Sequence, residues 1–506
     1  MNRSIKRISL AVLVMFVVLL VNVNYLQAVQ APSLANRPLN DRTEYEQNQI
    51  QRGNIVTADG VTIATTKPSN DLFKYQRVYP GGSMYAPVTG YDTIFTQSQA
   101  PNYATGVERA ENALLTGTGS ELAFRNFIDM ITNKPQKGAT VQVTINSKAQ
   151  KAAYDELASA LAGHTISGKQ QVGGVVALDP TTGAILAMAS YPSFDPTLLA
   201  VHDTIALNKI DTQLSAQNPS PLLNNATQTT LPPGSTFKIV TSSAWYTQDA
   251  TRNPTTVVDS PQPLTLPNGN TLSNDGGEQC GSGSGKTAVL YAFAQSCNTP
   301  FAKIGTQLGG PLIKSMADLY GLNNALDIPG VSVAPSNFTA EADPSFTAFD
   351  AIGQHDTTVT PLQEAMFAAT VANGGTLMKP YLVQQVTASD LSIVEQTQPQ
   401  QFSQPISGTV ASYEKQMMTA VVQQQEGTGF SFNASNEGGL VIAGKTGTAQ
   451  NGESANPDAV FTAFAPAGNP RIAVGVMIEG GGYGAAAAAP IAVAVIQAYL
   501  KTLGIQ

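Results

Sequence analysis

The stretch LPPGSTFKIV, residues 231–240, decides how the whole chain is interpreted. Two prolines and a glycine interrupt the preceding segment, and Ser235 then stands before an apolar run with Lys238 one turn away. Side chains three positions apart share a helix face, so Lys238 can reach Ser235. A helix N-terminus favours a developing anion, and a lysine in a dry cleft can act as a base. The alternative is a serine that caps a helix beside a solvated lysine, and this pattern alone favours that alternative.

A second motif lies in AQSCNTP, residues 294–300, where Ser296 and Asn298 stand between two helical patterns. A hydroxyl there could relay a proton, and an amide could bind a peptide carbonyl or Lys238. Taken alone, the segment is explained better as a polar turn that ends a helix.

A third motif lies in AGKTGTAQ, residues 443–450, within an apolar strand pattern. Gly447 has no side chain, so an extended peptide can lie along this strand edge. Lys445 and Thr446 could hold a carboxylate, and Thr448 follows them. Alone, this motif too favours the structural alternative, a strand that ends in a Thr-Gly turn.

Together and in this order, the three motifs form the signature set of penicillin-recognising serine acyl-transferases. On these residues the chain resembles the class B penicillin-binding proteins over essentially its whole length, and it is most similar to their compact actinobacterial members. Three further stretches resemble sequences typical of that family: RGNIVTADGVTIA (52–64), GGVVALDPTTGAILAMASYPSFDP (173–196) and GQHDTTVTPLQEAMFAATVANGG (353–375).

The secondary-structure pattern predicts an α+β fold, because strand patterns at both ends of the second domain enclose a helical middle. The resemblance implies an N-terminal membrane anchor, a small mostly-β non-catalytic domain and a serine β-lactamase-like transpeptidase domain with a five-stranded antiparallel sheet flanked by helices.

Residues 389–410 are rich in Gln, Ser and Pro and predict a surface excursion. Helices are expected over 235–246, 289–308, 361–373 and 412–425. The expected segments are a cytoplasmic tail (1–7), a transmembrane helix (8–27), a pedestal domain (28–163) and the transpeptidase domain (172–506).

The N-terminus carries three basic residues before an apolar stretch that runs from Ile8 to Leu26. The positive-inside rule places the short N-terminus in the cytoplasm and the remaining chain outside. A cleaved signal peptide is the alternative, and both interpretations export the domains. Export permits a disulfide between Cys280 and Cys297 beside the second motif; the alternative is that Cys297 merely fills the small middle position of that motif.

Composition excludes some classes of function. The chain has 506 residues, a net charge of −8 and only 12% charged residues, so it lacks the basic surface of a nucleic-acid-binding protein. Metal-binding motifs such as HExxH and CxxC are missing, so we expect no metal and no cofactor. His355 is expected to be a structural turn residue.

The resemblance also implies a role for each motif residue. Ser235 attacks the penultimate D-alanine of a stem peptide and Lys238 accepts its proton. Ser296, helped by Lys445, passes a proton to the leaving amine, and Asn298 binds the substrate amide and orients Lys238. The substrate-binding residues are Thr446, Gly447 and Thr448.

Other functions share these motifs. A D,D-carboxypeptidase or a β-lactamase-like hydrolase would use water to deacylate the enzyme, and a β-lactam-binding scaffold would not catalyse. The preferred function is a D,D-transpeptidase in growth or division. Its expected partners are peptidoglycan stem peptides, β-lactams, membrane lipid, a membrane glycan polymerase and division proteins.

Overall fold

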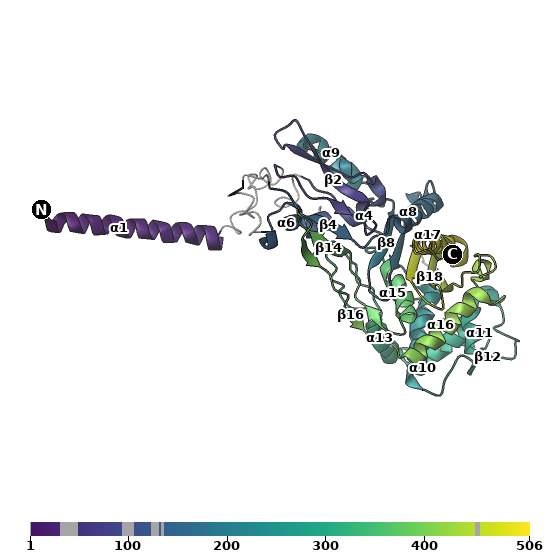
Figure 1. Cartoon of the computed structure of the whole chain (residues 1–506). Helices are drawn as coiled ribbons and strands as arrows, with labels where there is room; N and C mark the ends of the chain where they lie inside the picture. Colours follow the sequence, from purple (N-terminus) through teal and green to yellow (C-terminus); the bar gives the residue numbers. More distant parts are fainter. Residues whose placement is uncertain are drawn as a thin grey trace.

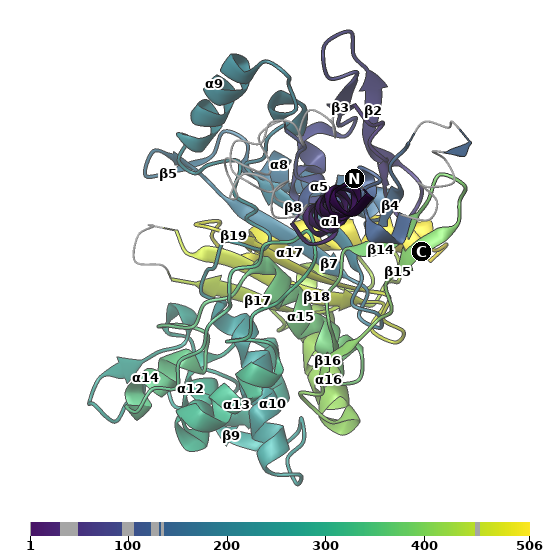
Figure 2. The same cartoon turned by 90° about the vertical axis from the view of Figure 1, so that its left-hand side faces the viewer.

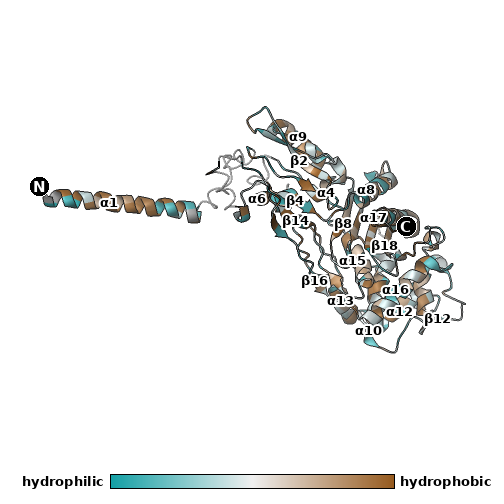
Figure 3. Ribbon diagram, viewed as in Figure 1, coloured by the Kyte–Doolittle hydropathy of each residue, from teal (hydrophilic) through white to brown (hydrophobic). Residues whose placement is uncertain are grey.

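A computed structural model describes residues 2–30, 49–93, 106–122, 131–132, 136–450 and 456–505. Helix α1 (Asn2–Tyr25) extends away from the body of the protein and continues into a π-helical turn, Leu26–Gln30 (Figure 1). Its stretch from Ile5 to Tyr25 has a mean hydropathy of 2.3, and none of it is buried against the protein. Figure 3 shows apolar residues along the middle of α1. This helix is long and apolar enough to anchor the protein in a membrane.

The N-terminal domain is built on a six-stranded sheet in the order β15-β14-β4-β1-β2-β3. Strands β1 and β2 form an antiparallel hairpin around Asp59-Gly60, a residue pair typical of tight hairpin turns. Strands β14 and β15 come from the C-terminal half of the chain, and β15 lies inside the predicted excursion. The two domains therefore share a sheet. Its strands are β1 (Ile55–Val56), β2 (Thr62–Pro68), β3 (Tyr75–Val78), β4 (Thr140–Val143), β14 (Val383–Thr387) and β15 (Ile393–Gln396).

A second sheet of five antiparallel strands, in the order β17-β18-β19-β7-β8, forms the centre of the C-terminal domain. Two of its strands begin the domain and three end it, which agrees with the expected α+β arrangement. The strands are β7 (Gly173–Leu178), β8 (Ile185–Tyr191), β17 (Ala443–Ala449), β18 (Asp458–Ala465) and β19 (Ile472–Ile478).

Helices cover both faces of this sheet. A Cβ on Gly475 would touch α15 (Pro361–Ala372), whereas one on Gly173 would touch α8 (Ser147–Leu161). Gly475 pairs with Val176 on β7, so the two residues share a face of the sheet. Successive residues of a strand alternate between faces, so Gly173 and Val176 point to opposite faces. Helices α15 and α8 therefore lie on opposite sides of the sheet. Helix α17 (Gly484–Thr502) packs beside α8. It also has the length and hydropathy of a membrane span, but half of it is buried in the protein.

A helical layer adjoins the sheet and lies at the opposite end of the body from β2 and β3 (Figure 2). The prediction of one continuous helix over 289–308 is wrong in one respect, because the helix is interrupted between α11 and α12. The helix predicted over 412–425 begins earlier, at Gly408, since the Ser407 side chain accepts a hydrogen bond from Val410 N. The helices of this layer are α10 (Lys238–Gln248), α11 (Val289–Ala294), α12 (Asn298–Leu308), α13 (Gly310–Leu319), α14 (Pro344–Asp350) and α16 (Gly408–Gln423).

Shorter elements connect these layers. Within the described residues, the remaining α-helices are α4 (Ala86–Thr89), α5 (Val107–Ala110), α6 (Asn112–Leu115) and α9 (Thr204–Ser215). The remaining strands are β5 (Thr165–Ile166), β6 (Lys169–Gln170), β9 (Val257–Asp259), β10 (Leu264–Thr265), β11 (Thr271–Leu272), β12 (Lys286–Ala288), β13 (Leu377–Met378) and β16 (Gln401–Ser403).

Candidate active site

Ser235 lies in a tight 3₁₀ turn, Gly234–Phe237, which leads directly into α10. Gly234 has a φ of +56°, and a Cβ there would lie 2.9 Å from Thr448 O, so only glycine fits this approach to β17. Gly234 N also donates to Gly353 O at 2.9 Å. Ser235 is half-buried, and Lys238, the first residue of α10, is completely buried. The helix start expected from the sequence is thus a 3₁₀ turn pressed against the third motif.

The second motif forms the break between α11 and α12. Ser296 adopts a φ of +61°, a left-handed conformation that a helix interior does not accept. Lys238 Nζ donates to Ser296 O at 2.7 Å and to Asn298 Oδ1 at 2.9 Å. The first two motifs therefore meet through the Lys238 side chain.

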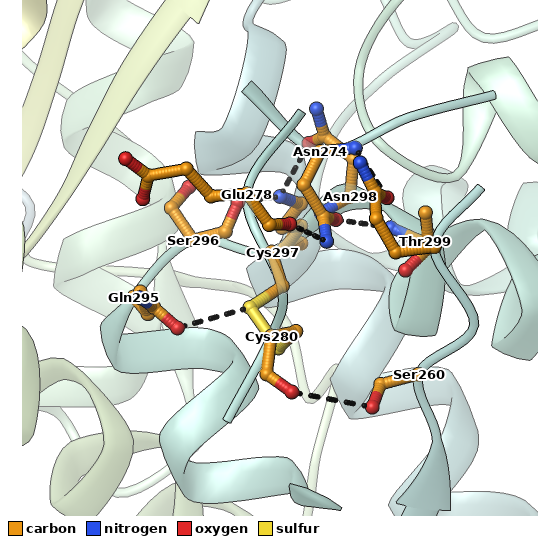
Figure 4. The surroundings of a disulfide bond; sticks show 11 residues. Ser260, Asn274, Glu278, Cys280, Gln295, Ser296, Cys297, Asn298 and Thr299 are labelled. Atoms are coloured by element: carbon orange, nitrogen blue, oxygen red, sulfur yellow. Dashed lines mark hydrogen bonds between the residues drawn. A yellow bond between two sulfur atoms is a disulfide. The ribbon is translucent and has the colours of Figure 1, made fainter. Parts of the chain in front are cut away.

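A loop that precedes α11 fixes this break from outside, as Figure 4 shows. Asn274 Oδ1 accepts from Asn298 N at 2.8 Å and from Thr299 N at 2.9 Å, so it caps α12 from another segment. Cys280 and Cys297 form a disulfide with an S–S distance of 2.03 Å. The loop is thereby tied to the middle residue of the motif by one covalent bond and to α12 by two hydrogen bonds.

The third motif occupies β17, the edge strand of the five-stranded sheet. Lys445 is completely buried, and its Nζ donates to Ser296 Oγ at 2.8 Å and to Thr446 O at 2.9 Å. A Cβ on Gly447 would lie 2.6 Å from Pro233 O, which shows how closely the strand approaches the turn before Ser235. All three motifs are therefore in direct contact.

The two buried lysines create an unusual electrostatic environment. Burial lowers the pKa of Lys238 well below its ordinary value, and the charge of Lys445 lowers it further. Burial lowers the pKa of Lys445 to about 7. Each Nζ lies over an aromatic ring, Lys238 at 5.5 Å from the centroid of Phe301 and Lys445 at 5.6 Å from that of Phe293. Because neither lysine forms an ion pair with a carboxylate of the described ranges, burial favours the neutral amine of each.

The motifs face one cleft, and the two lysines lie behind its wall. The hydroxyls of Thr446 and Thr428 are 2.6 Å apart, and both residues line the cleft. His355 also lines it, with a φ of +68° and its ring stacked on Phe346. The other lining residues are Ser235, Thr271, Leu272, Ser273, Asp275, Gln295, Ser296, Asn298, Phe349, Ile352, Gln354, Thr448, Gln450, Pro457, Tyr483 and Ala485.

Two residues of the site were missed by the motif search, Asn274 and Thr428. Both act across long sequence separations, and neither stands in a recognisable pattern. His355 is held by Asp350, whose Oδ1 lies 3.2 Å from its Nδ1. The side chains of Glu341, His355 and Asp356 lie within 4.8 Å of one another, with His355 and Asp356 exposed and Glu341 half-buried.

Comparison with known proteins places this geometry in context. Residues 173–497 match the family model of the penicillin-binding protein transpeptidase domain, and residues 52–141 match that of the penicillin-binding protein A dimerisation domain. The peptidoglycan D,D-transpeptidase PbpA of Mycolicibacterium smegmatis is 39% identical over 99% of both chains. Its namesake in Mycobacterium tuberculosis is 36% identical over the same share of each chain.

The similarity extends to three dimensions. A structure of M. tuberculosis penicillin-binding protein A, described as an imipenem acyl-enzyme complex, superposes with a TM-score of 0.81. It is 35% identical and covers 90% of this chain and 100% of the other. A ceftriaxone acyl-enzyme complex of the same protein gives a TM-score of 0.80.

Proposed function

The chain belongs to the penicillin-binding protein transpeptidases, and from this premise we propose how its residues cross-link peptidoglycan. It is a peptidoglycan D,D-transpeptidase and a β-lactam target. The observation that carries the proposal is the contact of all three motifs in one cleft, with Lys238 bonded to the second motif and Ser296 to the third.

Ser235 Oγ attacks the carbonyl of the penultimate D-alanine, and Lys238 Nζ takes its proton. A neutral lysine amine has two hydrogens and one lone pair. Both hydrogens are used by Ser296 O and Asn298 Oδ1, at 2.7 and 2.9 Å. The lone pair is therefore left to accept the Ser235 proton, and the lowered pKa of Lys238 supplies the neutral form.

The oxyanion that forms is held by the backbone N–H groups of Ser235 and Thr448. Thr448 lies on an edge strand, where part of the backbone is not used by β18, and the turn of Ser235 touches that strand. Loss of one such donor typically costs about 3 kcal/mol of transition-state stabilisation.

Departure of D-alanine requires a proton on its amine. Ser296 Oγ donates that proton and recovers one through Lys445 Nζ, 2.8 Å away. Thr446 binds the terminal carboxylate beside the Lys445 charge. An amine of a neighbouring stem peptide then attacks the acyl-enzyme and forms the cross-link. Its proton passes through Ser296 to Lys445, and Ser235 leaves with the proton that Lys238 holds.

A nitrocefin assay on the purified ectodomain separates this proposal from a hydrolase. A transpeptidase opens the β-lactam ring of about one equivalent as it becomes acylated and then stops, because its acyl-enzyme does not react readily with water. Continuous turnover would instead identify a β-lactamase. Release of D-alanine without any cross-linked dimer, when stem peptide and acceptor are both supplied, would identify a carboxypeptidase.

The apolar helix α1 supports a membrane location. We place the N-terminus in the cytoplasm and the catalytic domain outside, because Arg3, Lys6 and Arg7 lie at the N-terminal end of the helix, where its apolar stretch begins. A reporter fused to the C-terminus and active only outside the membrane tests this orientation, and activity of a cytoplasmic reporter there would reverse it. A membrane glycan polymerase and division proteins are the proposed partners, to be sought by cross-linking in intact cells.

A further inference from the structure

A glutamate that the mechanism above does not use lies directly behind the nucleophile. Glu364 is in the first turn of α15 and is completely buried. Its Oε1 lies 2.7 Å from Oγ1 of Thr236, the residue that follows Ser235. The carboxyl group therefore contacts the residue next to the catalytic serine, although Glu364 belongs to a different helix.

The hydroxyl of Thr236 has two neighbours but only one hydrogen. Its Oγ1 lies 2.9 Å from Pro233 O and 2.7 Å from Glu364 Oε1. A backbone carbonyl can only accept a hydrogen bond, and so can an ionised carboxylate. With Glu364 ionised, one of the two contacts would join two acceptors. With a proton on Glu364, both contacts are hydrogen bonds in series.

The surroundings of Glu364 also disfavour a charge. Its Oε2 has no hydrogen-bond partner within the part of the chain that the structure describes. An unpaired carboxylate in such a place is costly, so the neutral acid is favoured. Burial raises the pKa of Glu364 to about 8, and the hydrogen bond with Thr236 opposes part of this rise.

Among the residues that the structure describes, no neighbouring charge shifts the pKa of Glu364. The strands β7, β13 and β19, which pack against α15, carry no ionisable side chain. The ionisable residues on the remaining neighbours do not contribute to its pKa. They are Tyr413, Glu414 and Lys415 on α16 and Asp458 on β18, and the active-site residues Lys445 and Lys238 do not contribute either.

We propose that Glu364 is a positioning residue that works as a protonated acid. Its O–H donates to Thr236 Oγ1, and the Thr236 hydroxyl then donates to Pro233 O. Pro233 O in turn lies against β17, where a Cβ on Gly447 would come within 2.6 Å of it. The relay therefore holds the turn that carries Ser235 at a fixed place against the strand that carries Thr448.

This inference rests on the proposed acylation of Ser235 and gives it a pH dependence. Above pH 8 Glu364 ionises, the Thr236 hydroxyl turns toward the carboxylate, and Pro233 O loses its donor. Acylation then falls as the turn loosens. Lys238 and Lys445 also shape the pH profile, but a substitution at Glu364 leaves both in place, so the difference between variants isolates the glutamate.

The test measures the acylation rate of the ectodomain by a fluorescent penicillin from pH 6 to pH 10. In Glu364→Gln the amide donates at every pH, so we expect the wild-type rate at pH 7 without the alkaline fall. Glu364→Met donates nothing, and loss of one buried hydrogen bond predicts acylation about fivefold slower than in wild type at pH 7, again without the alkaline fall. Glu414→Gln is the matched control, a second completely buried glutamate, and it should keep the alkaline fall.

Identical pH profiles in wild type and Glu364→Gln would overturn the inference, as would a Gln variant as slow as the Met variant. Loss of the alkaline fall in Glu414→Gln would also contradict it, because the effect would then not belong to Glu364. If Glu364→Met does not fold, the comparison of wild type with Glu364→Gln still decides. Failure of the proposed function looks different, since wild type would then not be acylated at any pH.

Discussion

Asn274→Ala tests how the second motif is held in place. Asn274 Oδ1 accepts from Asn298 N and Thr299 N, and its Nδ2 donates to Glu278 O at 3.0 Å. Alanine leaves two N–H groups in the first turn of α12 without their acceptor. The Thr299 residue is completely buried, so its N–H gains no water in exchange.

The expected magnitude follows from these contacts. Loss of a helix cap costs about 1 kcal/mol, and a buried donor left unsatisfied costs about 1–3 kcal/mol. We therefore expect the free energy of unfolding to fall by about 2 kcal/mol. Asn298 begins α12 and holds Lys238, so a displaced α12 also misplaces the base. If about 1.4 kcal/mol of this loss reaches the transition state, acylation slows about tenfold.

Urea denaturation and the acylation rate with a fluorescent penicillin measure the two effects. Asn274→Asp keeps an acceptor for both N–H groups but loses the donor to Glu278 O, so it should lower both properties less than Asn274→Ala does. Asn253→Ala is the matched control, because Asn253 Oδ1 accepts from Thr255 N at 3.0 Å in a turn outside the motifs. An Asn274→Ala variant that is acylated at the wild-type rate would refute the reasoning, and so would an equally slow Asn274→Asp.

Three more predictions address other contacts of the cleft. The pKa of Lys445 is about 7 in the folded protein and about 10.4 in the unfolded chain, so stability should be lost as the pH falls between these values. The urea midpoint of wild type should therefore rise more from pH 7 to pH 9 than that of Lys445→Met, and equal rises would contradict the assignment. Thr428→Val removes the hydroxyl beside Thr446 and should slow acylation by a penicillin more than by its carboxyl ester, whereas equal slowing would count against a role in carboxylate binding. The denatured protein should show no free thiol until reductant is added, and two thiols without reductant would exclude the Cys280–Cys297 bond.

The motif residues and the hairpin at Asp59-Gly60 could be predicted because their signals are local. The α+β arrangement could also be predicted, since its strand patterns lie at the two ends of the second domain. Asn274 and Thr428 could not, because each acts on a residue that only the fold brings near: Asn298 for one and Thr446 for the other.

Two further features escaped prediction for physical reasons. The periodicity over 289–308 does not show the left-handed Ser296, since apolar residues continue on both sides of the break. Strand β15 is solvated over most of its length, so its sequence resembles a polar excursion. Strand β15 joins the N-terminal sheet because it pairs with β14, which in turn pairs with β4.

The central claim is that Ser235 becomes acylated. Intact-protein and peptide mass spectrometry of wild type and Ser235→Ala with a labelled penicillin tests it most directly. We predict one added penicillin on the wild-type peptide that contains Ser235 and none on the variant. Acylation that persists in Ser235→Ala, or a label on a different peptide of the wild type, would contradict the claim.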